Sequence, residues 1–332
     1  MSRIEVGGQA VIEGVMMRSP SAFVVACRTS DGEVVVREDR WRSAWERLKF
    51  LRWPFLRGGV VLWETLQNGF SALTFSANLK MEDVQREEAR LSPLRAPREP
   101  AAKPEPLGKG ELARLIMSAV AVVLLVFVAL PHLLTSLAGF RVETMSFHLV
   151  DGLIKLGILV AYVGGIALLP DIRRVYMYHG AEHKAIACYE SGAEMTVANA
   201  RGHSRFHPRC GTSFLLIVIL ISVLLFALAL HRPLSSVRAL DHALKLLIKI
   251  PLMLPVAGIA YEIIKLTGRW RAHPAVRVLT APGMWLQRLT TREPSDDQIE
   301  VALTAVQRCL AREELGRRAA TDVPLAAAAS HP

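Results

Sequence analysis

The stretch Phe214-Leu215-Leu216-Ile217-Val218-Ile219-Leu220-Ile221 decides the fold class, because it lies within an apolar run that extends from about residue 213 to residue 231. A helix needs roughly 20 consecutive apolar residues to cross the hydrocarbon core of a bilayer. Three further runs come close to that length, at about residues 112–134, 152–170 and 244–266. The sequence therefore predicts a mainly α-helical membrane protein with about four transmembrane helices.

The composition supports a membrane environment and narrows the expected partners. Of the 332 residues, 52% are hydrophobic and 21% are charged, and the net charge is +10. Many Lys and Arg residues flank the apolar runs, where they can contact anionic lipid headgroups. Basic and aromatic residues do not interleave as in an RNA-binding sheet. We therefore expect a lipid bilayer as partner, with a membrane-associated substrate or protein partner, and no nucleic acid.

The basic residues also predict an orientation. The loop at about residues 138–151 has Arg141 as its single Lys or Arg residue, whereas the loop at 171–212 has six Lys and Arg residues. Loops rich in Lys and Arg stay in the cytoplasm. The first residues also lack the apolar segment of a secretory signal. We expect a multi-pass protein with the loop at 171–212 and both termini in the cytoplasm.

The N-terminal region predicts a small β element followed by a helix. Two strand-like segments, Phe23-Val24-Val25-Ala26-Cys27 and Val34-Val35-Val36, flank a turn at Ser30-Asp31-Gly32, which is typical of a hairpin. The next segment, about residues 41–79, is expected to be helical with a break at Pro54. Polar residues interrupt its apolar face, so it fits either an interfacial amphipathic helix or a helix packed on the rest of the protein.

These features together predict the domain organisation. Prolines among charged residues mark a linker that cannot bury enough apolar surface to fold alone. The predicted regions are a cytoplasmic head with the β hairpin and interfacial helix (1–81), a disordered linker (82–110), a four-helix membrane region with a cytoplasmic His/Cys loop (111–268, loop 171–212), a C-terminal cytoplasmic helical segment (269–317) and a disordered tail (318–332).

The loop at 171–212 contains the best candidate for a chemical site. It includes His179-Gly180-Ala181-Glu182-His183, in a segment that reads as a helix up to Gly192, a natural helix stop. Residues four apart lie one above the other on a helix, so His179 and His183 share a face, and Glu182 lies beside them. Two imidazoles and a carboxylate on one face suit a divalent transition metal, and the spacing is the inverted form of a metalloprotease signature.

A second pair of possible ligands, His207 and Cys210, comes just before the third membrane run. A cysteine at a helix N-terminus favours the thiolate form that binds zinc. We therefore predict a divalent-metal site, most simply zinc, with His179, His183, His207 and Cys210 as ligands. The alternative is that the histidines contact lipid phosphates, and His203 is the weakest candidate of the group.

The number of ligands decides between two kinds of site. Four nitrogen and sulfur ligands make a closed structural zinc site, whereas a catalytic site keeps one position open. If either His207 or Cys210 stands aside, Glu182 becomes a candidate catalytic base. The sequence leaves both versions open.

Two other acids are expected to form structural ion pairs. Glu13 lies in an apolar segment and needs a partner if it is buried, for which Arg18 is the nearest cation. Glu262 lies near the end of the fourth apolar run, where Lys265 can pair with it. A substrate or metal at Glu13 remains the alternative.

The chain also resembles the YqhQ-like family of bacterial membrane proteins. The matching blocks extend from the N-terminal region almost to the end of the chain, at residues 7–16, 54–58, 178–184, 207–214 and 282–297. This resemblance implies a bacterial inner-membrane protein of a family regarded as predicted metal-dependent enzymes.

Three functional hypotheses follow. The first is a metal-dependent hydrolase that acts on a membrane-associated substrate. The second is a membrane scaffold or assembly factor with a purely structural metal. The third, a transporter, is ranked last because the apolar runs carry few central polar groups and show no inverted repeat.

Overall fold

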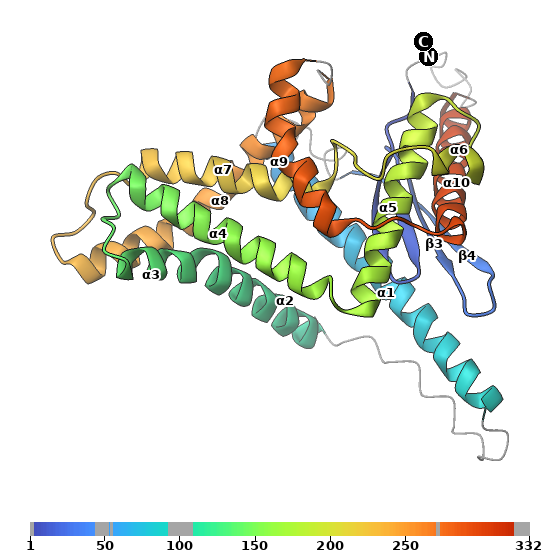
Figure 1. Cartoon of the computed structure of the whole chain (residues 1–332), viewed down its shortest axis with the longest axis horizontal. Coiled ribbons are helices and arrows are strands. Elements are labelled where there is room, and N and C mark those ends of the chain that lie inside the picture. The colour runs from blue at the N-terminus through green and yellow to red at the C-terminus, as the bar shows by residue number, and fades with distance from the viewer. Residues whose placement is uncertain (1–2, 44–52, 54–55, 92–108, 270–272, 322–332) are drawn as a thin grey trace, which may run out of the picture.

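The structure is a computed structural model that describes residues 3–43, 53, 56–91, 109–269 and 273–321. Figure 1 shows an elongated helical bundle at one end and a head, built from a β-sheet and flanking helices, at the other. The mainly α-helical membrane fold predicted from the sequence is confirmed.

The head is organised around a four-stranded antiparallel sheet. Its strands follow the order of the chain: β1 (Gly7–Val11), β2 (Gly14–Arg18), β3 (Ala22–Arg28) and β4 (Val34–Arg40). The predicted hairpin is the pair β3–β4, and Gly32 in its turn has a φ of 88°, which glycine adopts without strain. The sheet thus has four strands, whereas the turn signal in the sequence predicted a hairpin of two.

Side chains alternate between the two faces of the sheet along each strand, and helices pack against both faces. Val15, Met17, Val24 and Ala26 pack against helices α5 (Pro170–Ser191) and α10 (Asp296–Thr321). The opposite face includes Met16, Phe23 and Val25 and packs against helix α1 (Leu56–Leu91). Helix α5, which carries the predicted ligands His179 and His183, is therefore packed against the sheet of the head.

The bundle contains four helical segments that are long and apolar enough to cross a membrane. They are Met117–Leu137, which spans α2 (Lys109–Leu124), a π-helical turn (Leu125–Ala129) and α3 (Leu130–Leu137); α4 (Met145–Ile166); α7 (Gly211–Ala229); and Arg238–Leu266 within α8 (Arg238–Arg269). The four predicted membrane runs are confirmed. The connections at 138–144 and 230–237 lie at the end of the bundle opposite the head.

Helix α1 combines the two alternatives considered for this segment. It packs against α8, where a Cβ on Gly58 would lie 2.8 Å from Gly258 Cα, yet Leu62, Trp63 and Phe70 are exposed as on an interfacial helix.

Helix α1 also corrects the predicted linker, because residues 82–91 are helical. Glu82 and Arg86 form an i,i+4 ion pair, and Asp83 accepts a hydrogen bond from the Ser30 amide at 2.9 Å. The charged residues at 82–91 favour a helix and are held against the β3–β4 hairpin, so they extend α1. Residues 92–108 of the predicted linker lie outside the described residues, and its last two residues, 109 and 110, begin the next helix.

The C-terminal region is more ordered than expected. Helix α9 (Pro274–Thr290) forms the first part of the predicted helical segment and packs on α7 and α4, where a Cβ on Gly283 would lie 2.9 Å from Ser213 Cα. Helix α10 forms the second part of that segment and continues to Thr321, so the predicted tail begins in a helix. Residues 322–332 lie outside the described residues.

The two acids expected to pair locally instead form long-range ion pairs. Glu13 has a φ of 53° in the tight turn between β1 and β2, and it pairs with Arg174 of α5 rather than with Arg18. Glu262 of α8 pairs with Arg57 of α1, 205 positions away in the chain. These pairs join the head to α5 and α1 to α8, and sequence proximity could not indicate them.

Candidate metal centre

Helix α5 presents two histidines on one face. It begins with Pro170, whose fixed φ suits a helical N-terminus, and it ends at Gly192, which has a φ of 80°. The predicted end of this helix is confirmed. The rings of His179 and His183 lie 4.5 Å apart, as expected for residues one turn apart.

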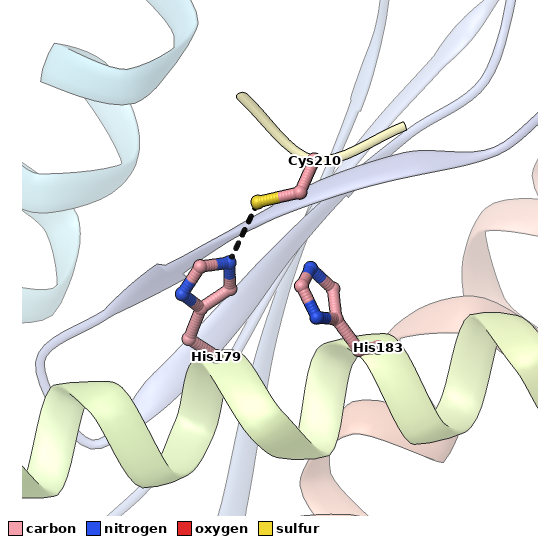
Figure 2. A group of neighbouring side chains, drawn as sticks. All are labelled: His179, His183 and Cys210. Carbon is pink, nitrogen blue, oxygen red and sulfur yellow. Dashed lines mark hydrogen bonds between the residues drawn. The ribbon is translucent and has the colours of Figure 1, made fainter. Parts of the chain in front are cut away.

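Cys210 completes a group of three possible ligands (Figure 2). It is the N-cap residue of α7, and its Sγ lies 3.2 Å from His179 Nε2. The possible ligand atoms of His179, His183 and Cys210 all lie within 4.8 Å of one another. A tetrahedral zinc ion with bonds of about 2.0–2.3 Å holds its ligand atoms roughly 3.3–3.7 Å apart, so a small closure of the group would accommodate it.

Both histidines are oriented for metal binding by backbone carbonyl groups. His179 Nδ1 lies 2.8 Å from Thr290 O, and His183 Nδ1 lies 2.6 Å from Arg205 O. A carbonyl oxygen only accepts hydrogen bonds, so each Nδ1 must carry the proton and each Nε2 keeps its lone pair. Histidine ligands of metals are commonly held in this way. This orientation is the feature of the structure that best fits a metal site.

Burial of His183 favours the form of the ring that binds metal. Only 2% of this residue is exposed, and burial lowers its pKa below the ordinary value, with a smaller opposing effect from a hydrogen bond to Cys210. A lowered pKa keeps the imidazole neutral at physiological pH, and the neutral ring is the one that can donate a lone pair.

Glu182 lies in the same buried region. Its Oε1 approaches Gly8 so closely that a Cβ on that glycine would lie 2.8 Å away, and its Oε2 is buried without a hydrogen-bond partner. Burial raises the pKa of this carboxyl to about 7, although the charge of His179 and the Gly8 amide act in the opposite direction. A buried acceptor without a partner is costly unless a ligand or water satisfies it.

The other predicted ligand, His207, lies next to this group but outside it. Its ring is 5.7 Å from that of His183, and its Nε2 lies 3.4 Å from a carboxylate oxygen of Glu190. The weakest candidate, His203, has its Nε2 3.4 Å from Ser191 Oγ. The structure thus brings three of the four predicted ligands together and leaves the fourth beside an acid.

Three further residues hold the ligands in place, and the sequence analysis did not single them out. Gly180 allows the chain at Arg292 to cross α5, because a Cβ at this position would lie 2.1 Å from Arg292 O. The side chain of Gln287 is fully buried and bonds to both the amide and the carbonyl of His207 at 2.8 Å, which fixes the loop that carries Cys210.

Lys184 is the third of these supporting residues. Only 4% of it is exposed, and its Nζ donates to the carbonyls of Arg201 and His203 and pairs with Glu293 at 2.8 Å. The ammonium group therefore ties the connection after α5 to the segment before α10. A lysine directly after the His/Glu motif was the only sequence signal for this role.

The three ligands face a cavity of about 520 Å³ where the head meets the bundle. Its polar lining residues include Gln9 and Glu182 of the head. Its apolar lining residues include Leu62 of α1 and Phe214 of α7. The cavity thus brings the three possible ligands together with polar groups of the head and apolar side chains of α1 and α7.

Comparison with known proteins identifies the family. Residues 53–312 match the family described as "Protein of unknown function (DUF1385)". The chain belongs to the DUF1385 family. It is also 33% identical over 319 residues to the uncharacterized protein YqhQ of Bacillus subtilis (strain 168), and the match covers 94% of each chain. No solved structure matches the chain. Membership of the DUF1385 family supports the resemblance noted in the sequence and gives no information about activity.

Proposed function

We propose that this protein binds a divalent metal ion, zinc, through His179, His183 and Cys210, and that it is a metal-dependent hydrolase of a membrane-associated substrate. The observation that carries the proposal is the orientation of the two imidazoles. Each turns its Nε2 toward the Cys210 sulfur while its Nδ1 bonds to a backbone carbonyl. Soft sulfur and imidazole ligands in this combination favour zinc.

The number of ligands favours a catalytic site over a structural one. Three protein ligands leave one coordination position for water or substrate, as in catalytic zinc sites. The alternative of a scaffold with a structural metal needs a fourth ligand, and the nearest candidate, His207, faces Glu190. A closed site would therefore require His207 to leave its present partner.

Glu182 fits the role of general base. It lies in the cavity wall beside the ligands, and its Oε2 has no protein partner. A zinc ion would supply Lewis-acid activation of water and of the scissile group. Glu182 would accept the proton of the attacking water and return it to the leaving group, which is the usual function of a carboxylate at such a site.

The apolar wall of the cavity supports a membrane-associated substrate. Side chains of α7 and α8 reach the cavity from the segments that are apolar enough to cross a membrane. A substrate with an apolar tail could thus remain partly in the bilayer while its polar group meets the metal. The excess of basic residues near this end supports a cytoplasmic orientation of the head in a bacterial inner membrane.

Metal analysis of the purified full-length protein tests the proposal. We expect about one zinc per chain in the wild type and a large loss in His183→Ala. The matched control is His203→Ala, which removes a histidine from the same region but outside the group of three. Equal zinc in the wild type and in His183→Ala would overturn the site.

A second variant tests the proposed base. Glu182→Gln keeps the shape of the side chain and should retain zinc while losing hydrolysis of acyl and phosphoryl esters embedded in vesicles. Full activity in this variant would contradict the role of Glu182 as base. Loss of zinc together with activity would assign Glu182 as a metal ligand instead.

A further inference from the structure

A second group of ionisable side chains lies inside the bundle, away from the metal centre. We call it the bundle cluster, and its members are His132 on α3, His148, Asp151 and Lys155 on α4, and Asp241, His242, Lys245 and Lys249 on α8. Lys245 and Lys249 have no exposed surface, and Asp151 is 1% exposed. Charges buried at membrane depth cost several kcal/mol each, so their retention points to a function.

The cluster is close to the end of the bundle opposite the head. Lys249 comes 11 positions after Arg238, the first residue of α8, which corresponds to about 16 Å along the helix axis. Half of the hydrocarbon core is about 15 Å thick, so Lys249 lies roughly at its centre when Arg238, the first residue of the apolar segment, is placed at the membrane boundary. The cluster therefore connects the centre of the bundle with the face opposite the head.

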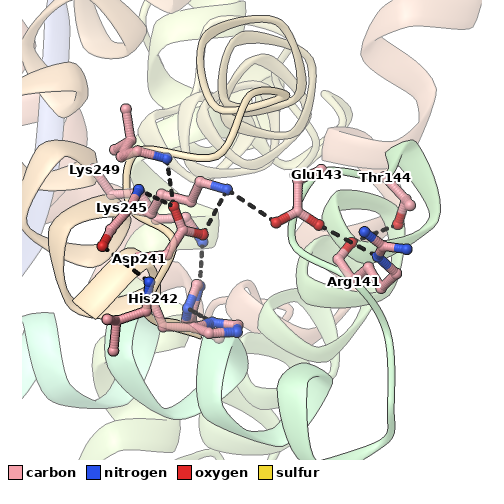
Figure 3. Close-up of polar contacts among 11 residues, drawn as sticks. Arg141, Glu143, Thr144, Asp241, His242, Lys245 and Lys249 are labelled. Carbon is pink, nitrogen blue, oxygen red and sulfur yellow. Dashed lines mark hydrogen bonds and ion pairs between the residues drawn. The ribbon is translucent and has the colours of Figure 1, made fainter. Parts of the chain in front are cut away.

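The buried lysines differ in the carboxylates available to them. Lys245 has two, Asp241 at 2.8 Å and Glu143 at 3.4 Å (Figure 3). Lys155 has Asp151 at 2.5 Å. Within the described part of the chain, the carboxylate that Lys249 can reach is Asp151, at 3.6 Å, which already pairs with Lys155.

This shortage of negative charge singles out Lys249. One carboxylate neutralises one ammonium group, so the second lysine next to Asp151 is the one that can most readily give up its proton. The faces of Phe147 and Phe226 lie 5.5 Å and 5.4 Å from Lys249 Nζ and stabilise its charged form. The surroundings of Lys249 thus favour its uncharged form through the shortage of carboxylates and its charged form through the two aromatic rings.

A chain of hydrogen-bonding groups leads from Lys249 toward the face opposite the head. Lys249 Nζ lies 3.0 Å from His132 Nδ1, and His132 Nε2 lies 3.1 Å from His242 Nδ1. His242 lines two cavities, one of about 410 Å³ with polar walls and one of about 500 Å³ between α3 and α8. Solvent in the polar cavity could exchange protons with His242.

The cluster also has unused hydrogen-bonding capacity. Both ring nitrogens of His148, which is 1% exposed, and Asp151 Oδ1 are buried without a partner. Groups in this condition usually bind water or a ligand. A small polar species inside the bundle is therefore expected next to Lys249.

We propose that Lys249 is a proton-binding site within the membrane, which exchanges protons with the face opposite the head through His132 and His242. In the uptake step, the N–H bond at His132 Nδ1 breaks as a new N–H bond forms on the uncharged Lys249 amine. In the same step His242 Nδ1 gives its proton to His132 Nε2, and a solvent proton binds to His242 Nε2, so that both imidazoles stay neutral. The net result is one added proton, and thus one positive charge, on Lys249.

The other groups that face Lys249 bear on this step. Lys155 opposes a further positive charge on Lys249 and Asp151 favours it, whereas the charge of Lys245 is offset by Asp241 and Glu143. His148, whose ring nitrogens are buried without a partner, lies close enough to Lys249 for their charges to interact. Packed lysines and acids of this kind are found in proton relays of membrane proteins. The cluster also removes one reason for ranking a transporter last, since the spans do carry central polar groups.

Proton uptake by the full-length protein in lipid nanodiscs tests this proposal, and it does not depend on the zinc site. An indicator dye reports the protons bound when the pH is stepped from 9 to 6. We expect the wild type to take up about one more proton per chain than Lys249→Arg, which keeps a permanent positive charge. The control is Lys265→Met, at the head-side end of α8, which should match the wild type.

Two further variants test the route and guard against misfolding. Lys249→Met should show the same loss of one proton as Lys249→Arg. His242→Asn should keep the total uptake but slow it by about tenfold or more. Equal uptake in the wild type and in Lys249→Arg would overturn the proton site, and unchanged kinetics in His242→Asn would overturn the route.

Discussion

The orientation of His179 by a backbone carbonyl can be tested through Gly180. A carbonyl group cannot be removed by substitution, but the segment that carries it can be displaced. A Cβ at position 180 would lie 2.1 Å from Arg292 O, whereas ordinary contacts of such a carbon begin near 3.4 Å. In Gly180→Ala the crossing segment must therefore move by about 1.3 Å.

That displacement should break two hydrogen bonds. One joins the Arg292 amide to Tyr176 O at 2.8 Å, and the other joins His179 Nδ1 to Thr290 O at 2.8 Å. Each is worth about 1 kcal/mol, and the crowding adds about 1–3 kcal/mol, so we expect a loss of about 3–5 kcal/mol in folding free energy. Loss of the carbonyl that orients a ligand should weaken zinc binding by roughly 10–100-fold.

Competition with a chelating zinc indicator measures this effect in the purified protein. The matched control is Gly211→Ala, next to the ligand Cys210, where an added Cβ meets nothing within 4 Å. We expect the control to bind zinc like the wild type. Wild-type affinity in Gly180→Ala would refute the orientation of His179 by Thr290.

Two further predictions concern the supports of the site and the head. Gln287→Ala should lower the free energy of unfolding by about 2–4 kcal/mol in denaturant titrations and weaken zinc binding, because the buried amide and carbonyl of His207 lose their partner; a variant as stable as the wild type would contradict this. Burial raises the pKa of Glu313, but hydrogen bonds from Ser21 and Ser19 outweigh this effect and hold the pKa below its ordinary value. The ionised Glu313 should therefore stabilise the head at pH values above the ordinary pKa of Glu, and this stabilisation should be lost as the pH falls through the lowered pKa. Thermal unfolding should thus show a shallower acid decline in Glu313→Gln, and identical declines would contradict the assignment.

The sequence predicted the elements whose signals are local. The four membrane runs follow from hydropathy, and the β3–β4 hairpin follows from its Asp31-Gly32 turn. The turn between β1 and β2 was missed because Ile12 and Glu13 give no turn signal. The extension of α1 to residue 91 was missed because its charged residues are held by contacts with the hairpin that depend on the tertiary fold.

The candidate site was predictable where spacing along one helix decides geometry. His179, Glu182 and His183 share a helix face, so the sequence placed them together. Whether His207 joins them depends on Glu190, whose side chain the sequence could not place. The supporting contacts of Gln287 depend on how helix α9 packs against the loop before α7, which the sequence does not indicate.

The bundle cluster could have been predicted from the sequence but was not recognised. Asp151 and Lys155 are four positions apart, as are Asp241, Lys245 and Lys249, so each set lies on one face of its helix. Average hydropathy hides such residues, because a few charges among many apolar side chains barely change the mean. The meeting of the two faces with His132 requires the packing of three helices.

X-ray absorption at the zinc edge of the purified wild-type protein tests the central claim most directly, because it counts the atoms bound to the metal. A centre with three protein ligands predicts one sulfur at about 2.3 Å, together with two imidazole nitrogens and one oxygen from water or substrate at about 2.0–2.2 Å. Replacing Cys210 by Ser should remove the sulfur signal. A zinc site without sulfur in the wild type, or one with three imidazoles and a sulfur, would contradict the open three-ligand centre.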